Sequence, residues 1–319
     1  MDKVSRPLKY IFGPVPSRRL GRSLGIDLVP NKTCTFDCIY CELGRTTHKT
    51  ILRQSHVSPR EIQGELEIYL SGLEKKPDYI TLSGSGEPTL NINIREIIRR
   101  IKEITSTPVA VLTNSSLLSL NEIRMDLSEA DVVLPSLDAI TPALFEYVNR
   151  PHASLGIEGI ISGLIQFRNQ YRGQIWLEVV FCRGINDDKE EIERLKGVIE
   201  RIQPDRVQLN TPVRPPAEEF AYPLTTAQLE EIRKKLGGKA EIISEFTAPL
   251  GEEFNSVKDT KILNLIKRRP CTTEDISKAL GLRIDEVVKH LDHLTKTGAI
   301  RYRMYEHRCY YENVATDQI

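Results

Sequence analysis

The feature that most constrains the fold is a repeated alternation of short apolar runs with amphipathic segments. Six runs have the length and β-branched composition of buried strands, and each is followed by a segment with helical periodicity. Because parallel strands need a crossover connection that is usually helical, this order predicts an α/β fold with a parallel sheet. The predicted strands are residues 24–30, 78–83, 108–114, 131–138, 174–182 and 205–210.

The segments between these strands give more local predictions. Ser58-Pro-Arg-Glu61 has the spacing of a capping box with proline at the first helical position, so a helix is expected from there to about Leu73. Another helix is expected at 94–104. Residues 12–23 are rich in Pro, Gly and Arg and predict a loop. A last, peripheral strand is expected at 239–246.

Three cysteines follow the first predicted strand. Cys34, Cys38 and Cys41 have the spacing C-x-x-x-C-x-x-C, with no fourth cysteine nearby. A [4Fe–4S] cluster normally uses four Cys thiolates, so three would leave one iron open to a ligand that is not protein. A zinc finger needs paired C-x-x-C arms and a disulfide framework needs an even set. Three buried thiols, or a zinc site with a distant fourth ligand, are the alternatives.

The cysteine stretch resembles the radical S-adenosylmethionine (radical SAM) superfamily. The resemblance implies that the open iron binds the amino and carboxylate groups of SAM, and that Tyr40 packs against the adenine. Gly84-Ser85-Gly86-Glu87-Pro88 looks like the family's Gly-Gly-Glu motif, which contacts the SAM amino group; its glycines allow close backbone approach. The family also implies a partial (β/α)6 TIM-type barrel and a low-potential electron donor of the flavodoxin or ferredoxin type.

Polar residues end the predicted strands, where the loops of a parallel barrel build the active face. By the resemblance, Asn114, Ser136 and Asp138 are candidate contacts to the ribose and methionine groups of SAM. Glu178 and Cys182 are candidate catalytic residues at the barrel mouth, where Cys182 would donate a hydrogen atom; a small core residue is the alternative. The arginines near the cysteine loop could bind a phosphate or carboxylate of the substrate in a bidentate manner. Surface ion pairing is the other interpretation of these arginines. The candidate substrate-binding residues are Arg18, Arg19, Arg22 and Asn210.

The tail predicts a second, small domain at 256–319, after a barrel domain at 1–248 and a linker at 247–255. Its order is helix 261–267, helix 272–280, turn, helix 284–294 and a hairpin at 299–311, which is typical of a winged helix-turn-helix. The third helix is expected to place one apolar face toward the core, made of Ile284, Val287, Val288, Leu291 and Leu294.

The charge of this tail does not decide what it binds. From Asn255 onward there are 12 Lys and Arg residues and 9 Asp and Glu residues. The hairpin interleaves Arg with Tyr, as surfaces that bind single-stranded nucleic acid do, and an ordinary half-buried hairpin has the same pattern. We therefore expect an RNA or a protein partner for the winged helix domain, since a fold does not fix its use.

The substrate hypothesis comes from a wider resemblance. The run from Gly13 to Ile26, then the three cysteines, then Glu42-Leu-Gly-Arg-Thr-Thr47, is similar to radical SAM proteins related to the enzymes that make wyosine bases in tRNA. Those enzymes carry a second cluster on upstream cysteines, and this chain has none before Cys34. The resemblance thus implies hydrogen abstraction, with tRNA or RNA as the substrate hypothesis and no product named. A DNA-binding regulator that senses its cluster or SAM is the alternative, and a zinc-binding structural protein is a third.

Composition narrows the setting. Lys and Arg together number 44, as do Asp and Glu, so no global charge favours nucleic acid or a membrane. No apolar stretch approaches the ~20 residues of a membrane span, and the N-terminus lacks a signal-peptide core. Six cysteines are too few for a disulfide scaffold in a chain of this size, and free thiols fit a reducing compartment. We therefore expect a cytoplasmic protein with no membrane partner.

Overall fold

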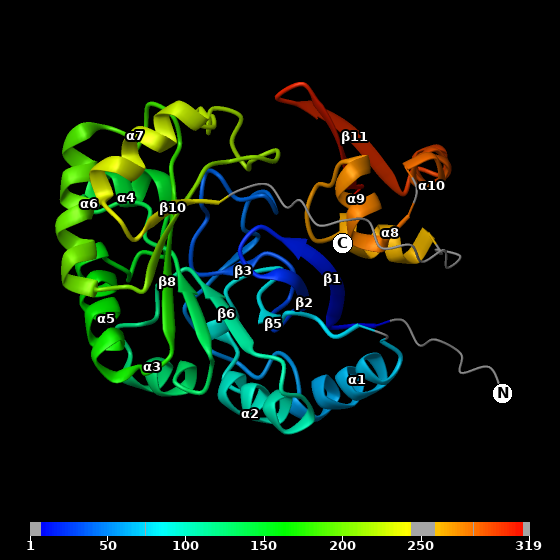
Figure 1. Cartoon of the computed structure of the whole chain (residues 1–319), viewed down its shortest axis with the longest axis horizontal. Coiled ribbons are helices and arrows are strands. Elements are labelled where there is room, and N and C mark those ends of the chain that lie inside the picture. Colours follow the sequence, from blue (N-terminus) through cyan, green and yellow to red (C-terminus); the bar gives the residue numbers. More distant parts are fainter. Residues whose placement is uncertain (1–7, 74, 244–258, 283, 315–319) are drawn as a thin grey trace.

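The computed structural model describes residues 8–73, 75–243, 259–282 and 284–314. Its main body is an open sheet of eight strands in the order β1-β2-β5-β6-β7-β8-β9-β10, with helices along the outside (Figure 1). Six of its seven parallel strands correspond to the six predicted strands and confirm the α/β fold. They are β2 (Gly21–Ile26), β5 (Tyr79–Leu82), β6 (Val109–Thr113), β7 (Val132–Pro135), β8 (Gln174–Val180) and β9 (Arg206–Asn210).

The two edges of this sheet differ from each other. The predicted loop at 12–23 is wrong over most of its length, because β1 (Ile11–Ser17) pairs with β2 as an antiparallel edge strand. Proline is tolerated at an edge, where it need not donate to a ladder, so Pro14 and Pro16 do not prevent a strand here. At the other edge β10 (Ala240–Ile242) is parallel to β9, at the start of the predicted peripheral strand. The predicted linker at 247–255 lies outside the described residues.

Seven helices belong to this main body. Helix α2 begins and ends as predicted, because four of its five isoleucines, at helical spacing, are fully buried, each worth about 1.5–3 kcal/mol. The predicted capping box before α1 is wrong: Ser58 makes no side-chain cap, and the Glu61 carboxylate accepts instead from Tyr10 Oη at 3.3 Å. The helices are α1 (Pro59–Ser71), α2 (Ile94–Ile104), α3 (Asn121–Leu127), α4 (Pro142–Asn149), α5 (Ile157–Gln170), α6 (Lys189–Ile202) and α7 (Thr226–Leu236).

The remaining described residues, 259–282 and 284–314, form what we call the C-terminal unit. It has three helices and a two-stranded hairpin around its own apolar core, as the sequence predicted; its naming as a winged helix stays a prediction. One expectation is wrong: Ile284 and Val288 are 50% and 48% exposed, while Val287, Leu291 and Leu294 are buried. The apolar stripe of the third helix is therefore narrower than its sequence suggests. The elements are α8 (Asp259–Ile266), α9 (Thr273–Leu280), α10 (Ile284–Lys296), β11 (Ile300–Tyr305) and β12 (Arg308–Asn313).

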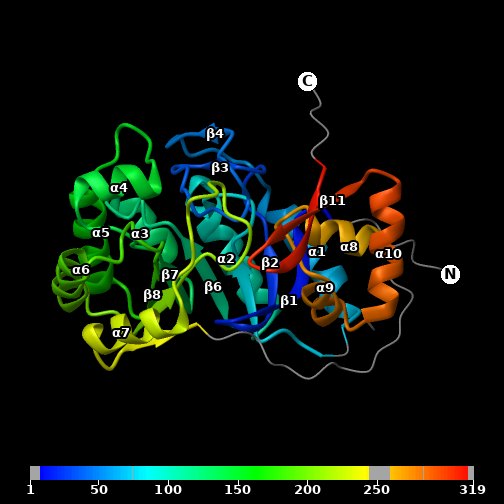
Figure 2. The same cartoon turned by 90° about the horizontal axis from the view of Figure 1, so that it is seen from above.

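The C-terminal unit packs against β1 and the carboxyl end of the sheet (Figures 1 and 2). Val15 of β1 packs into the core of the unit. Arg268 Nε lies 2.8 Å from Asp27 Oδ2, and Tyr310 Oη donates to the Val213 carbonyl at 2.6 Å. The unit therefore closes one side of the face where the barrel loops gather. Among the described residues, no helix has the length and apolar content needed to cross a membrane.

Candidate active site

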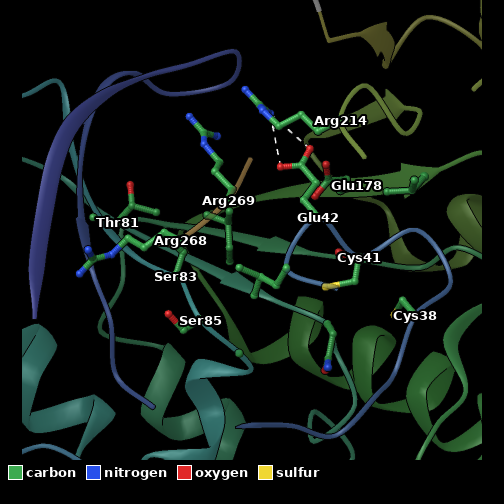
Figure 3. A pocket seen from close by; sticks show the side chains of 18 of the residues that line it. Cys38, Cys41, Glu42, Thr81, Ser83, Ser85, Glu178, Arg214, Arg268 and Arg269 are labelled. Carbon is green, nitrogen blue, oxygen red and sulfur yellow. Dashed lines mark hydrogen bonds and ion pairs between the residues drawn. The ribbon is translucent and has the colours of Figure 1, made fainter. Parts of the chain in front are cut away.

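A cavity of about 400 Å³ lies at the carboxyl ends of the parallel strands, between the cysteine loop, the strand ends and the C-terminal unit (Figure 3). It is enclosed by segments from both ends of the chain. Most of the residues singled out in the sequence line it together. They are Arg18, Arg19, Cys34, Cys38, Tyr40, Cys41, Gly84, Ser85, Gly86, Glu87, Asn114, Ser136, Glu178 and Asn210.

The three thiols share one wall of this cavity. Two short parallel strands, β3 (Thr33–Cys34) and β4 (His48–Lys49), join the ends of the cysteine loop. Asn114 Nδ2 lies 3.4 Å from Cys34 Sγ, and Asn149 Nδ2 lies 3.5 Å from Cys38 Sγ. Amide donors that face sulfur are a usual means of orienting and tuning cluster thiolates.

The donor set fits a cluster better than a single metal ion. Within the described parts of the chain, no three His, Cys, Asp or Glu side chains converge closely enough for one ion. A cubane cluster is wider and takes one thiolate per iron, which suits three free thiols spread over a wall. Burial raises the pKa of Cys34 to about 12 and that of Cys41 to about 11, so the thiolates need the positive charge of bound metal.

The glycines after β5 serve a close approach between two loops. A Cβ on Gly86 would lie 1.9 Å from the Thr33 carbonyl oxygen, and one on Gly84 would lie 1.7 Å from Asp27 Oδ1. Ser85 stands between them without such a clash, and its N–H donates to Asp27 Oδ1 at 2.7 Å. The Gly84–Glu87 loop is thereby held against the start of the cysteine loop, with its backbone along the cavity.

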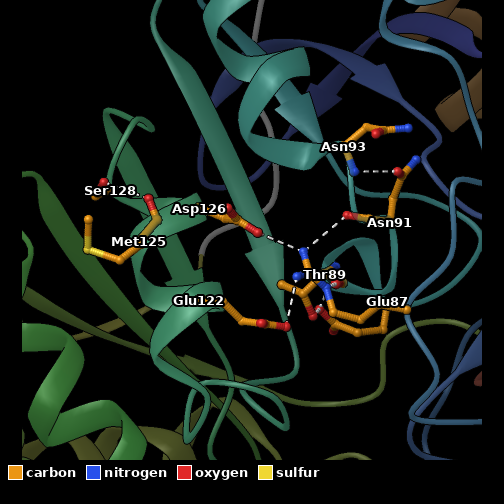
Figure 4. A network of polar contacts seen from close by, with 9 residues as sticks. Glu87, Thr89, Asn91, Asn93, Glu122, Met125, Asp126 and Ser128 are labelled. Atoms are coloured by element: carbon orange, nitrogen blue, oxygen red, sulfur yellow. Dashed lines mark hydrogen bonds and ion pairs between the residues drawn. The ribbon is translucent and has the colours of Figure 1, made fainter.

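Glu87 is a buried carboxylate that links this loop to β6. Its side chain lies beside Thr89 (Figure 4). Its oxygens accept from the backbone N–H and the hydroxyl of Thr89, from the Thr113 hydroxyl and from the Asn114 N–H, at 2.6–3.1 Å. Burial raises the pKa of Glu87, and these donors oppose the rise. The carboxylate fixes the position of Asn114, which in turn contacts Cys34.

Two candidates, Asp138 after β7 and Cys182 after β8, do not face the cavity. Asp138 lies behind Tyr40, whose hydroxyl donates to it, and also accepts from Asn149 Nδ2 and the Val180 N–H at 2.9 Å. Burial raises its pKa to about 6. Cys182 is fully buried in an apolar cluster with Ile39, because β8 ends at Val180 and the inward alternation stops there. The expectation that Cys182 lies at the mouth with Glu178 is wrong, and the core interpretation holds; Asp138, expected to point inward toward SAM, is absent from the cavity lining.

Two further candidates also lie outside the cavity. Pro88 is buried at the start of a short 3-10 helix, Pro88–Leu90. Arg22 is absent from the lining, and its N–H donates to Asp78 Oδ2 at 2.7 Å. The turn between β1 and β2 points Arg18 and Arg19 toward the cavity, whereas Arg22 already belongs to β2.

The four polar candidates over β8 and β9 form one connected group. Arg18 Nη1 donates to Asn210 Oδ1 at 3.2 Å, and Asn210 Nδ2 donates to Glu178 Oε1 at 2.9 Å. Glu178 in turn forms an ion pair with Arg19. The sequence placed these residues separately on a loop and two strand ends, and the fold brings them together.

Five charged residues of the lining were missed from the sequence: Lys32, and the four shown in Figure 3, Glu42, Arg214, Arg268 and Arg269. Glu42 follows the last cluster cysteine and lies 3.2 Å from Arg214 Nη1, in the loop after β9; Arg268 and Arg269 come from the C-terminal unit. Burial raises the pKa of Glu42, but the guanidiniums of Arg214, Arg269 and Arg18 outweigh burial and lower it to about 2. Only the packing of distant segments brings these arginines to one carboxylate, so no local pattern signals them.

Comparison with known proteins agrees with this site. The model of the radical SAM superfamily matches residues 28–195. A UPF0026 protein of Methanocaldococcus jannaschii is 38% identical over 278 residues, which is 85% of each chain. A Brachyspira hyodysenteriae protein named GTPase Obg is 38% identical over 296 residues, which is 92% of this chain but 43% of that protein. The chain thus spans less than half the length of that relative.

Among solved structures, a radical SAM methyltransferase from Sphaerobacter thermophilus has a TM-score of 0.49 at 16% identity, covering 69% of this chain and 65% of the other. Fold and site together define an α/β enzyme with a three-cysteine cofactor loop. The chain belongs to the radical SAM superfamily, within which the M. jannaschii UPF0026 protein is a close relative. It is therefore a radical SAM enzyme, a family that implies SAM and a [4Fe–4S] cluster as cofactors.

Proposed function

We propose that this enzyme reductively cleaves SAM and abstracts a hydrogen atom from an RNA substrate, with Cys34, Cys38 and Cys41 as the cluster ligands. The observation that carries the proposal is the placement of three free thiols on one wall of a cavity at the carboxyl end of a parallel sheet. When bound, the cluster supplies the electron that splits SAM into methionine and a 5′-deoxyadenosyl radical, and a flavodoxin- or ferredoxin-type protein renews that electron.

The chain itself positions and shields the reactants. Asn114 and Asn149 orient two of the thiols. Tyr40, fixed by Asp138, offers its ring to the adenine, and the Gly84–Glu87 backbone offers acceptors to the SAM ammonium. Ser136 lies in the same lining and is our candidate contact to the ribose. A closed cavity protects a radical from side reactions, which is the main task left to the protein.

We assign RNA binding to the C-terminal unit, taken as a winged helix domain. Tyr302 is 64% exposed on β11, beside Met304 at 60%, and an exposed aromatic ring such as that of Tyr302 can stack on unpaired bases. Arg301 and Arg303 are paired with Glu312 and Glu219, so the hairpin offers stacking more than free positive charge. The contact of this unit with the cavity supports a substrate that is held by both parts.

The test is anaerobic reconstitution of the full chain with iron and sulfide, reduction with dithionite, and quantification of 5′-deoxyadenosine with and without total small RNA. Wild-type protein should form 5′-deoxyadenosine, and RNA should stimulate it. Cys34→Ser should abolish formation, because it removes one of three cluster ligands. Cys309→Ser is the matched control, since this thiol lies on β12, outside the cavity lining. Normal 5′-deoxyadenosine formation by Cys34→Ser would refute the assignment.

A further inference from the structure

Five arginines from three distant segments line the mouth of the cavity. Three of them have carboxylate partners: Arg19 pairs with Glu178, Arg214 with Glu42, and Arg268 with Asp27. Within the described residues, Arg18 and Arg269 form no ion pair; the partner of the Arg18 guanidinium is the neutral amide of Asn210.

This leaves two guanidiniums facing one cavity without an ion pair of their own, because Glu42, the carboxylate near both, is already paired with Arg214. A charge removed from water destabilises the fold unless it is paired, and an arginine that lines a cavity usually pairs with an anion there. The planar fork of arginine binds phosphate or carboxylate through two parallel hydrogen bonds. Nearby carboxylates do not meet this need, because Glu42, Glu178 and Asp27 are each held by another arginine.

The carboxylate of SAM does not account for these two arginines. The Gly84–Glu87 loop, which faces the methionine part of SAM in our proposal, follows β5. Arg18 is held over the end of β9 through Asn210, and three strands lie between β5 and β9 in the sheet. Arg18 therefore lies on the side of the cavity left for the substrate, and Arg269 lies near Glu42 and Arg214 (Figure 3).

We infer that the substrate carries a phosphate group that is bound jointly by Arg18 of the barrel and Arg269 of the C-terminal unit. The two positive charges match a phosphate monoester, which carries about −1.5 to −2 at neutral pH. The inference rests on the proposed function, because the substrate occupies the same cavity. It makes the C-terminal unit part of the active site and assigns it a chemical role that its sequence does not signal.

The test uses the cluster-loaded full chain and isothermal titration calorimetry under anaerobic conditions, with SAM present. Adenosine 5′-monophosphate should bind at least tenfold more tightly than adenosine, since a charge-assisted pair contributes about that factor. Arg18→Gln and Arg269→Gln should each remove this preference while SAM affinity stays unchanged. Arg60→Gln is the matched control, because Arg60 is exposed on α1 and does not line the cavity.

A second arm distinguishes the source of the phosphate. A short RNA with a 5′-hydroxyl has only backbone phosphates, so its loss of binding in Arg269→Gln would assign the site to the RNA backbone, and retained binding would assign it to a terminal phosphate. Equal affinity of the wild type for the monophosphate and adenosine, or a preference kept by both variants, would overturn the inference. A loss of SAM affinity in the variants would overturn it as well.

The two proposals fail separately in these measurements. If wild-type protein forms 5′-deoxyadenosine but shows no preference for phosphate, the anion site is wrong and the radical chemistry stands. If the preference is present and 5′-deoxyadenosine is absent, the anion site stands without the proposed chemistry.

Discussion

At the scale of single residues, Cys182 is expected to behave as an unreactive core thiol. It is fully buried beside Ile39 and Val148, and burial raises its pKa well above the usual range of thiols. Only a thiolate is nucleophilic, so iodoacetamide should leave Cys182 unmodified in the native protein and alkylate it after unfolding. Cys182→Ala should lower the free energy of unfolding by about 1 kcal/mol, because it leaves a small cavity. Mass spectrometry that finds rapid alkylation under native conditions would contradict this.

The site residues that belong to local sequence patterns were predictable, and those brought in by distant segments were not. The cysteine spacing and the Gly84–Glu87 loop are local patterns, and the structure brings both to one cavity. Asp138 was misplaced because alternation along a strand gives a side chain its face but not what covers that face; here Tyr40 covers it. Arg269 was missed because its only signal is a contact between segments more than two hundred residues apart.

At the scale of elements, the loop after β5 depends on a close contact that only glycine allows. Gly86→Ala should force the Gly84–Glu87 loop away from Thr33, because the new Cβ would lie 1.9 Å from a backbone oxygen. We expect SAM affinity to fall at least tenfold, as measured by calorimetry on the reconstituted protein. Gly197→Ala in α6 is the control, since its Cβ meets nothing within 4 Å and alanine favours a helix by about 1 kcal/mol. Unchanged SAM affinity in Gly86→Ala would exclude the loop from the SAM site.

Helices and strands differ in how well their own residues predict their bounds and burial. The bounds of α2 follow from four isoleucines at helical spacing, so they were predictable to the residue. Strand β1 was not predictable, because prolines in a segment predict a loop unless the segment is known to lie at the edge of a sheet. The third helix of the C-terminal unit was predicted in place but not in burial, since Ile284 and Val288 are about half exposed.

At the scale of the whole molecule, the barrel and the C-terminal unit share enough contacts to unfold together. Val15 of β1 belongs to the core of the unit, Arg268 pairs with Asp27, and Tyr310 bonds the Val213 carbonyl. Part-buried hydrogen bonds and ion pairs of this kind contribute about 1–3 kcal/mol each. Calorimetry should therefore give one transition whose measured enthalpy equals the van't Hoff enthalpy.

The cooperativity of unfolding can be tested by mutating these contacts. Arg268→Gln combined with Tyr310→Phe removes two of the part-buried links and leaves both apolar cores and the Arg214–Asp275 and Arg303–Glu219 ion pairs in place. If the two removed links carry the cooperativity, the single transition should split into two. Lys267→Gln with Tyr302→Phe is the matched control and should keep one transition, because neither side chain forms a hydrogen bond or ion pair with the described part of the barrel. Two transitions in the wild type would mean that the C-terminal unit docks only loosely. Arg269 would then reach the cavity only part of the time, and the shared phosphate site would weaken in proportion.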